Sequence, residues 1–253
     1  MGRVTEVADD VFLAEGTDVN WVLLREGRDV TLIDAGYPGD RIAVAESIRA
    51  VGARPDDVRA VLLTHAHIDH MGAANELFAQ YAVPLFVDPV EVSHAHRDHL
   101  EQAGPAAVVR NITRPGVLPW SLRVVRAGAL KKVALLHAQP FPGTGPLDLP
   151  GRPVPVATHG HTSGHSAYFV PHAGVVVTGD ALVTAHPVST VDGPQILGPM
   201  FNHGTQDEAL AAIGALEVLD AGVILPGHGP VARLPVAEAV ARARGAAVRP
   251  GSP

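Results

Sequence analysis

Apolar runs that end at glycine or polar residues recur through the first third of the chain. Val19–Leu24 and Asp29–Asp34 predict two strands, with a hairpin turn at Arg25–Arg28 between them. Arg41–Val51 has apolar residues at helical spacing and stops at Gly52, which predicts a helix. The same criteria predict a strand, a helix and a further strand at Val58–Leu63, Ala73–Gln80 and Pro84–Val87.

Regular patterns return in the last part of the chain. They predict strands at Val154–Ala157, Ala167–Val170, Gly174–Thr178 and Val223–Leu225, and helices at Gln206–Leu219 and Pro235–Arg244. Strands that alternate with helices are typical of a mixed α/β fold. Residues 89–150, rich in proline and glycine, predict an insertion or cap over the core. Without an internal repeat or a clear linker, we expect one domain over residues 1–253, with the cap at about 89–150.

Composition fits this interpretation and restricts the chemistry. The 253 residues are 47% hydrophobic and 18% charged, which is enough apolar material for a sizeable core. There is no cysteine, so disulfides, iron–sulfur clusters and thiolate zinc sites are excluded. Any metal must therefore bind nitrogen and oxygen ligands.

The charge and the hydropathy limit the partners. A net charge of −7 disfavours nucleic acid, although Arg97–Lys132 holds seven basic and two acidic residues. That basic segment either meets an anionic substrate or is a solvated helical face. No apolar run suggests a signal peptide or a membrane span. We expect a cytoplasmic protein that acts on a small molecule and has no membrane or nucleic-acid partner, and a homodimer remains open.

One histidine-rich motif follows an apolar strand directly. It reads His65-x-His67-x-Asp69-His70, in a chain that holds 14 histidines. In an extended segment residues i and i+2 point to the same side, so His65, His67 and Asp69 can face one pocket. The turn at Gly72 brings His70 beside them. Four such donors cannot all reach one small ion in a tetrahedron, but they can serve two neighbouring ions.

Three later loops offer further metal ligands. His161, Asp180 and His228 each follow a predicted strand and lie next to a glycine. Glycine allows the backbone to bend close to an ion. We therefore expect these three side chains to complete the site.

This ordered set of motifs resembles the metallo-β-lactamase superfamily over nearly the whole chain. The resemblance implies a four-layer αββα sandwich with two metal ions at one edge of the two sheets. It implies that Asp180 bridges the two ions, that Asp34 supports a ligand from behind, and that His165 is a supporting or pocket residue. It assigns His65, His67 and His161 to the first zinc ion, and Asp69, His70 and His228 to the second.

Other histidines have more ordinary interpretations. His94-x-His96-x-Asp98-His99 repeats the motif 29 residues later, but no comparable strand precedes it and no glycine turn follows. The segment continues to Ala103 as a helical pattern, on which i and i+2 diverge. We expect no second metal site there, although these residues could line the cap. The remaining expectation is that His159 is a neighbour of the site and that His137, His172 and His186 are surface side chains.

The resemblance predicts a binuclear zinc-dependent hydrolase that uses metal-bound hydroxide, with iron or manganese as alternative metals. Asp69 is the predicted catalytic residue, because it can hold the nucleophile or take its proton. Asp180 argues against a true β-lactamase, because those members generally have Cys or Ser there. The pattern is closer to glyoxalase II, lactonases and related esterases, but the segment after His228 is too short for the glyoxalase II C-terminal domain.

The predicted substrate is a carboxylic ester, a lactone or a thioester. A phosphodiester or other phosphoester is the first alternative, which basic residues of the cap would suit. A mononuclear iron persulfide dioxygenase is a second alternative, against which the complete set Asp69, His70 and His228 argues. A non-catalytic binding module is a third, and no ligand position is lost to support it.

Overall fold

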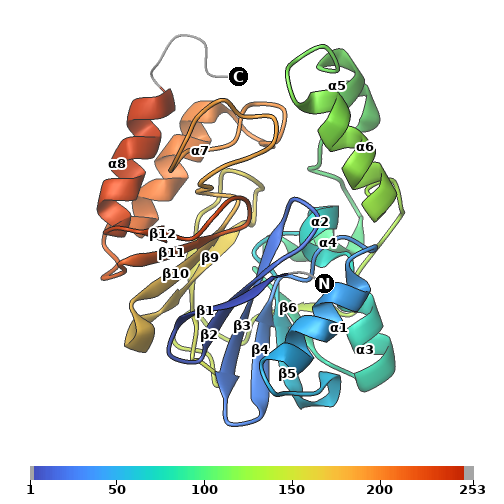
Figure 1. Ribbon diagram of the computed structural model, residues 1–253, viewed down its shortest axis with the longest axis vertical. Coiled ribbons are helices and arrows are strands. Elements are labelled where there is room, and N and C mark those ends of the chain that lie inside the picture. Colours follow the sequence, from blue (N-terminus) through green and yellow to red (C-terminus); the bar gives the residue numbers. More distant parts are fainter. Residues whose placement is uncertain (1–2, 248–253) are drawn as a thin grey trace.

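The computed structural model describes residues 3–247, so the ends of the predicted domain, residues 1–2 and 248–253, lie outside the described residues. Two β-sheets face each other in the middle of the molecule (Figure 1). The first sheet contains, in pairing order, β1 (Val4–Ala8), β2 (Val11–Glu15), β3 (Asn20–Glu26), β4 (Asp29–Ile33), β5 (Val58–Leu62), β6 (Leu85–Val87) and β7 (Ala138–Pro140). The second contains β12 (Ala232–Arg233), β11 (Val223–Pro226), β10 (Val175–Gly179), β9 (Ser166–Val170) and β8 (Val154–Ala157).

The strand directions differ along each sheet. In the first, β1 to β4 pair antiparallel and β4 to β7 pair parallel. In the second, only β10 and β11 pair parallel among the described strands. The helices are α1 (Arg41–Ala50), α2 (Ile68–Met71), α3 (Ala74–Tyr81), α4 (Val92–His96), α5 (Pro105–Arg110), α6 (Val117–Ala127), α7 (Gln206–Ala212) and α8 (Val236–Ala247), and short 3₁₀ turns are η1 (Pro55–Asp57), η2 (Pro171–Ala173) and η3 (Ile213–Leu216).

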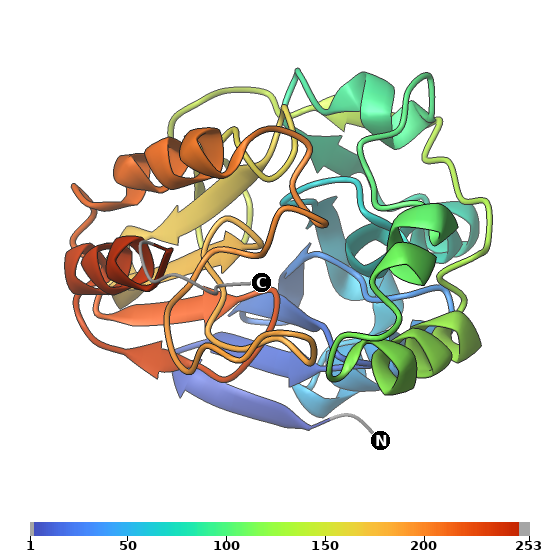
Figure 2. The same cartoon turned by 90° about the horizontal axis from the view of Figure 1, so that it is seen from above.

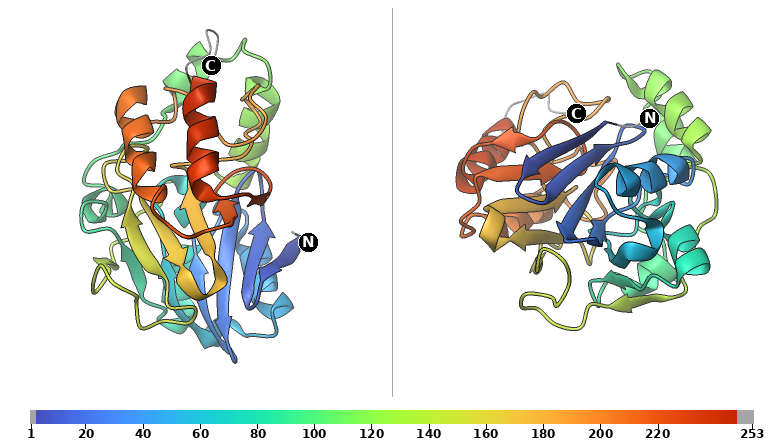
Figure 3. Two further views of the ribbon diagram at one scale, coloured as in Figure 1. Left: turned by 90° about the vertical axis from the view of Figure 1, so that its left-hand side faces the viewer. Right: turned by 60° about the horizontal axis from the view of Figure 1, so that its bottom comes forward.

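Three apolar layers hold the sandwich together. Side chains of a strand alternate between its two faces, so Leu23 of β3 packs toward α1 and α3, while Val22 and Leu24 pack between the sheets. In β10, Val176 packs toward α7 and α8, and its neighbours fill the space between the sheets. Helices therefore cover the outer face of each sheet, as Figures 1 and 3 show. This is the predicted αββα arrangement.

Two predicted elements have different limits in the structure, and a glycine lies at each difference. The hairpin turn is shorter than predicted: β3 runs to Glu26, and Gly27 adopts a φ of 62° in the two-residue connection to β4. The helix predicted over 206–219 ends at Ala212 and continues as η3, which contains Gly214. Glycine weakens a helix interior, which explains the early end.

Four strands, β1, β2, β7 and the two-residue β12, were missed by the sequence patterns. β1 and β2 carry acidic residues and form the outer part of the first sheet, and β7 has only three residues, of which the last is proline. Proline cannot donate to a sheet and is tolerated at an edge, so β7 has a weak signal. Such strands form because a neighbouring strand is available to pair with, which a local pattern does not record.

Residues 89–150 contribute to more than one layer. α4 precedes a loop that leads to α5 and α6, and β7 returns to pair with β6. Val117, Trp120 and Val124 of α6 pack on Tyr37 and on the loop that contains Phe201. Seen from above, α5 and α6 stand across from that loop at one end of the sandwich (Figure 2). Among the described residues, no helix is both long and apolar enough to cross a membrane.

We predict that Gly72→Ala destabilises the protein by about 2 kcal/mol or more, as overpacking does in a tight core. A Cβ at Gly72 would overlap the backbone of Tyr37 and Pro38, which cannot move aside as a flexible side chain can. Thermal unfolding measures the effect. The matched control is Gly143→Ala, where a Cβ meets nothing within 4 Å. Equal melting temperatures for the two variants would show that the turn after the histidine motif has room to relax.

Candidate metal centre

The predicted ligands lie where strands of both sheets end. Leu62 ends β5, and His65 and His67 follow in the loop before α2, where His67 has an extended conformation. The extended geometry stops there, because Asp69 and His70 lie in the short helix α2, which begins at Ile68. Asp69 therefore reaches the site by a helical turn, whereas the sequence pattern assigned it to an extended segment.

The other ligand candidates come from the second sheet. His161 lies in the loop between β8 and β9, Asp180 follows β10, and His228 follows β11. Parallel pairing of β10 and β11 brings the last two strand ends side by side. Close packing leaves no room for a side chain at Gly227, whose Cβ would meet Asp180 and the ring of His70. Glycine is required here for the loops to approach each other.

The seven predicted ligands form two donor groups. In each, the candidate ligand atoms all lie within 4.8 Å of one another. Asp180 belongs to the first group but also reaches the second: its Oδ2 is 3.5 Å from His161 Nε2 and 3.1 Å from His228 Nε2, and its Oδ1 is 3.3 Å from His70 Nε2. The first donor group is His65, His67, His161 and Asp180, and the second is Asp69, His70 and His228.

Hydrogen bonds behind the rings fix the protonation of the first donor group. His67 Nε2 lies 3.0 Å from the carbonyl oxygen of Glu101, which can only accept, so this nitrogen carries the proton. His161 Nδ1 faces Asn202 Oδ1 at 3.0 Å. His65 Nδ1 donates to the hydroxyl of Thr64, because that hydroxyl donates its own proton to Asp34. The second nitrogen of each ring is left to face the site.

The two histidines of the second donor group are held in the same way. His70 Nδ1 donates to Asp34 Oδ2 at 2.8 Å, and His228 Nδ1 donates to the carbonyl oxygen of Asp18 at 2.5 Å. Their Nε2 atoms point toward Asp180. Fixing the outer nitrogen in this way sets the tautomer and the orientation of a metal-binding imidazole.

Three buried side-chain atoms have no hydrogen-bond partner within residues 3–247: His65 Nε2, His70 Nε2 and Asp180 Oδ1. All three face this site. An unpaired buried polar atom costs about 1–3 kcal/mol, so such a cluster calls for an occupant that satisfies all of them. Divalent cations at the two donor groups would do so, and nitrogen and oxygen donors of this kind suit zinc, iron or manganese. The residues therefore fit a metal.

Burial and neighbouring charges act in opposite directions on these groups. Burial lowers the pKa of the three histidines of the first donor group. Burial has the same effect on His70 and His228, but nearby carboxylates, Asp180 first among them, outweigh it and raise the pKa of both. Burial raises the pKa of Asp180, yet His228 and His70 lower it overall. The carboxylates thus favour a positive charge between Asp180, His70 and His228, and a bound cation would supply that charge.

Asp34 and His165 contact the predicted ligands and their neighbours from outside the two donor groups. Asp34 accepts hydrogen bonds from the backbone N–H and the hydroxyl of Thr64 in addition to the ring of His70. His165 Nδ1 donates to Thr158 at 2.8 Å, and its Nε2 accepts the backbone N–H of Asp180 at 3.1 Å. Burial lowers the pKa of His165 to about 3, so the ring is neutral and keeps these two roles.

The second histidine motif has a different environment. Its helix, α4, ends at His96 and does not continue to Ala103, because Arg97 takes a left-handed conformation with a φ of 67°. His94 is buried against Glu91, whereas His96 bonds to the carbonyl oxygen of Ala138. The two rings therefore have separate partners.

His186 was predicted to be a surface side chain, and this is wrong. It is 6% exposed and its ring lies 4.9 Å from that of His228 and 4.8 Å from that of Phe201. His159 is a half-exposed neighbour of the site that pairs with Asp88 at 3.3 Å. The pattern around His186 has no feature that would distinguish it from a surface histidine.

Sequence reasoning also missed residues that hold the ligands. Asn202 and Asp18 contact His161 and His228, but they are 41 and 210 residues away along the chain. Glu91 and Glu101 flank the second histidine motif and bond to the ligand-bearing loops. Only this proximity to a histidine cluster could have drawn attention to them.

A largely apolar pocket lies beside the donor groups. His186 forms part of its wall and also packs on His228, so the pocket lies next to the candidate metal centre. The pocket extends between the start of α6 and the end of α8. Other lining residues include Arg114, Val117, Val188, Ile196, Leu197, Met200, Phe201 and Ala243.

Known proteins share both the sequence pattern and the fold. A probable metallo-hydrolase of Bacillus subtilis, YflN, is 26% identical over 81% of this chain and 76% of its own length. A hydroxyacylglutathione hydrolase of Alkalilimnicola ehrlichii is 27% identical over 83% of this chain and 61% of its own length. The solved structure of a metallo-beta-lactamase of Cronobacter sakazakii matches with a TM-score of 0.67 at 18% identity, covering 96% of this chain and 92% of that one, which shows a common fold.

The sequence pattern of the family described as the metallo-beta-lactamase superfamily matches residues 14–228. That range contains strands β3 to β11 and every residue of the two donor groups. Members of this superfamily are metal-dependent hydrolases. The chain belongs to the metallo-beta-lactamase superfamily.

Proposed function

We propose that this protein is a binuclear zinc-dependent hydrolase of a carboxylic ester, lactone or thioester with an apolar acyl group. The observation that carries the proposal is the position of the apolar pocket. Its wall includes His186, whose ring packs on His228 of the buried metal-binding donors. A pocket of this kind fixes the apolar part of a substrate, while the polar reacting group meets the donors.

Two ions are proposed because the donors divide into two groups that share Asp180. His65, His67 and His161 would hold one ion, and Asp69, His70 and His228 the other, with Asp180 between them. When bound, a zinc pair activates a water molecule and polarises a carbonyl oxygen. Without cysteine in the chain, all protein ligands are imidazole or carboxylate groups, which zinc accepts.

Asp69 is the proposed proton acceptor. Its side chain is 15% exposed, whereas that of Asp180 is 3% exposed, so it is the more open carboxylate of the two. Its Oδ2 lies 3.6 Å from His228 Nε2 and 3.9 Å from His70 Nε2. From this place it can hold a water molecule by a hydrogen bond and take its proton as the carbonyl is attacked.

The lining of the pocket favours an acyl group over a phosphoryl group. Arg114 is the one permanently charged side chain among the described lining residues, and it is exposed. Burial lowers the pKa of His186 to about 3, so this ring adds no positive charge. The relative named hydroxyacylglutathione hydrolase supports an acyl substrate as well.

We predict that zinc-loaded protein hydrolyses a lactone, thioester or aryl ester with a medium-length acyl chain faster than a phosphodiester. Asp180→Asn should lower this turnover by at least about 100-fold, the upper end of what removal of a mere supporting residue costs. The assay is a substrate panel with metal content measured on the same samples. If Asp180→Asn kept both metal content and turnover, hydrolysis at a shared metal pair would be excluded.

We predict that Val188→Phe reduces kcat/KM for substrates with a long acyl chain about tenfold relative to the acetyl substrate. Val188 lines the pocket, and a larger ring there removes space that the chain needs. The control is Val125→Phe on α6, where the side chain is 46% exposed and outside the pocket lining. An unchanged ratio in Val188→Phe would place the acyl group elsewhere.

A further inference from the structure

Both backbone polar groups of Ala66, the residue between the first two histidines, are hydrogen-bonded to side chains. The backbone N–H of Ala66 donates to Glu91 Oε1 at 2.8 Å, and its carbonyl oxygen accepts from Arg97 Nη1 at 2.7 Å. Neither contact belongs to a sheet or a helix. Because Ala66 lies between His65 and His67, these bonds fix the direction in which both rings leave the backbone.

The same carboxylate also holds the loop that carries His161. Glu91 Oε2 accepts the hydroxyl of Thr162 at 2.9 Å and the backbone N–H of Gly164 at 3.0 Å. A Cβ at Gly164 would overlap Glu91, so the loop lies directly against it. One buried carboxylate thus joins two loops that leave different sheets, β5 of the first and β8 of the second.

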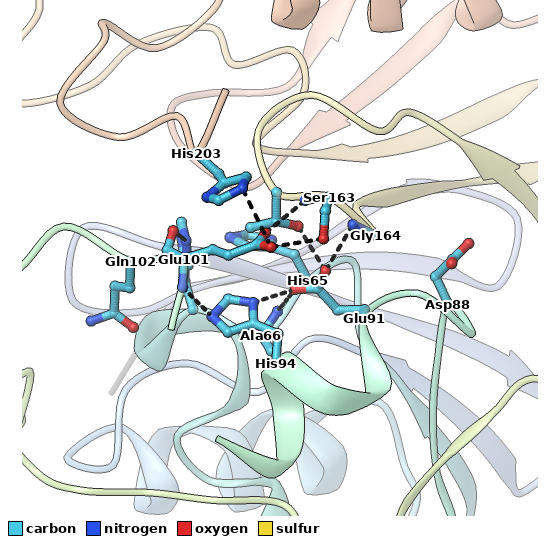
Figure 4. Close-up of polar contacts among 12 residues, drawn as sticks. His65, Ala66, Asp88, Glu91, His94, Glu101, Gln102, Ser163, Gly164 and His203 are labelled. Atoms are coloured by element: carbon cyan, nitrogen blue, oxygen red, sulfur yellow. Dashed lines mark hydrogen bonds and ion pairs between the residues drawn. The ribbon is translucent and has the colours of Figure 1, made fainter. Parts of the chain in front are cut away.

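Two further residues extend this connection, as Figure 4 shows. His94 Nδ1 donates to Glu91 Oε1 at 2.8 Å, and its Nε2 accepts the backbone N–H of Glu101 at 3.2 Å. The carboxylate of Glu101 accepts the backbone N–H and the hydroxyl of Ser163 at 2.7 and 2.8 Å. Its carbonyl oxygen accepts the ring of His67 at 3.0 Å. Glu101 therefore joins the same two loops a second time.

These three residues do not form another metal site, although their ligand atoms also lie within 4.8 Å of one another. Hydrogen-bond donors already occupy the carboxylate oxygens of Glu91 and Glu101, and both ring nitrogens of His94 are bonded. None of their atoms is among the unpartnered buried atoms of residues 3–247. This separates them from the two donor groups, where such atoms converge.

Taking the metal centre of the proposed function as given, we propose that Glu91, with His94 and Glu101, is a clamp that sets the spacing between His65, His67 and His161. These are positioning residues, because they touch the loops and not the reacting atoms. The clamp determines how tightly the three-histidine half of the site binds its ion. In the second half, Asp34 holds His70 and the carbonyl oxygen of Asp18 holds His228, and neither contact involves the clamp. Asp34 also supports His65 of the first half through Thr64.

The test is a zinc or cobalt(II) titration of metal-free protein, which resolves the affinities of the two ions. Glu91→Ala should weaken one ion about 10- to 100-fold, the usual effect of removing a group that supports a ligand, and leave the other unchanged. Asp34→Ala removes the acceptor of His70 and also that of Thr64, which holds His65, so it should weaken both ions. The double variant should lose both. The cobalt(II) absorption bands report which half is affected without any activity measurement.

Ser47→Ala is the stability control. It leaves the indole N–H of Trp21 unpaired in the core and so lowers the melting temperature, but it should leave both affinities unchanged. If Glu91→Ala does not fold, Glu91→Gln replaces it in the titration. The amide oxygen can still accept a hydrogen bond from one loop, but the NH₂ group faces a hydrogen-bond donor of the other loop and breaks the connection. Two wild-type affinities in a folded Glu91 variant would overturn the clamp. Failure of the wild-type protein to bind any ion would contradict the metal centre itself.

Discussion

Hydrogen bonds behind five imidazole rings are the interaction on which the rest of the site depends. Each outer nitrogen is held by a protein acceptor, so each inner nitrogen presents its lone pair to one small volume. Such a volume is unfavourable by itself, because buried donor atoms without partners destabilise the fold. The αββα sandwich tolerates this cluster at one sheet edge, where bound cations would satisfy the donors of both groups.

The two sheets contribute in different ways, and that division gives the clamp its importance. The first sheet supplies the His65–His70 segment, and the second supplies His161, Asp180 and His228. Packing between the sheets is apolar and non-directional, so it does not by itself align side chains within a fraction of an ångström. Directional bonds from Glu91 to both loops supply that alignment. The second histidine motif therefore packs against the first, and its residue His94 supports the clamp through Glu91 and Glu101.

Much of the fold and of the donor set could be predicted from local patterns. Strands such as β3, β4 and β5 alternate or run apolar within a few residues, and the ligands of the first motif lie within six positions of one another. The supporting contacts could not be predicted, since Glu91 bonds to Ala66 and Gly164 across 25 and 73 residues. His186 was missed for the same reason: a single histidine in a loop acquires its role from Phe201 and His228, which only the tertiary structure brings near.

The proposed function requires that the two donor groups hold a pair of zinc ions. Elemental analysis of protein purified without added metal measures zinc, iron and manganese per chain. We expect about two zinc ions per chain, one for each donor group. One iron ion per chain would contradict the binuclear hydrolase and would direct attention to oxygen-dependent chemistry.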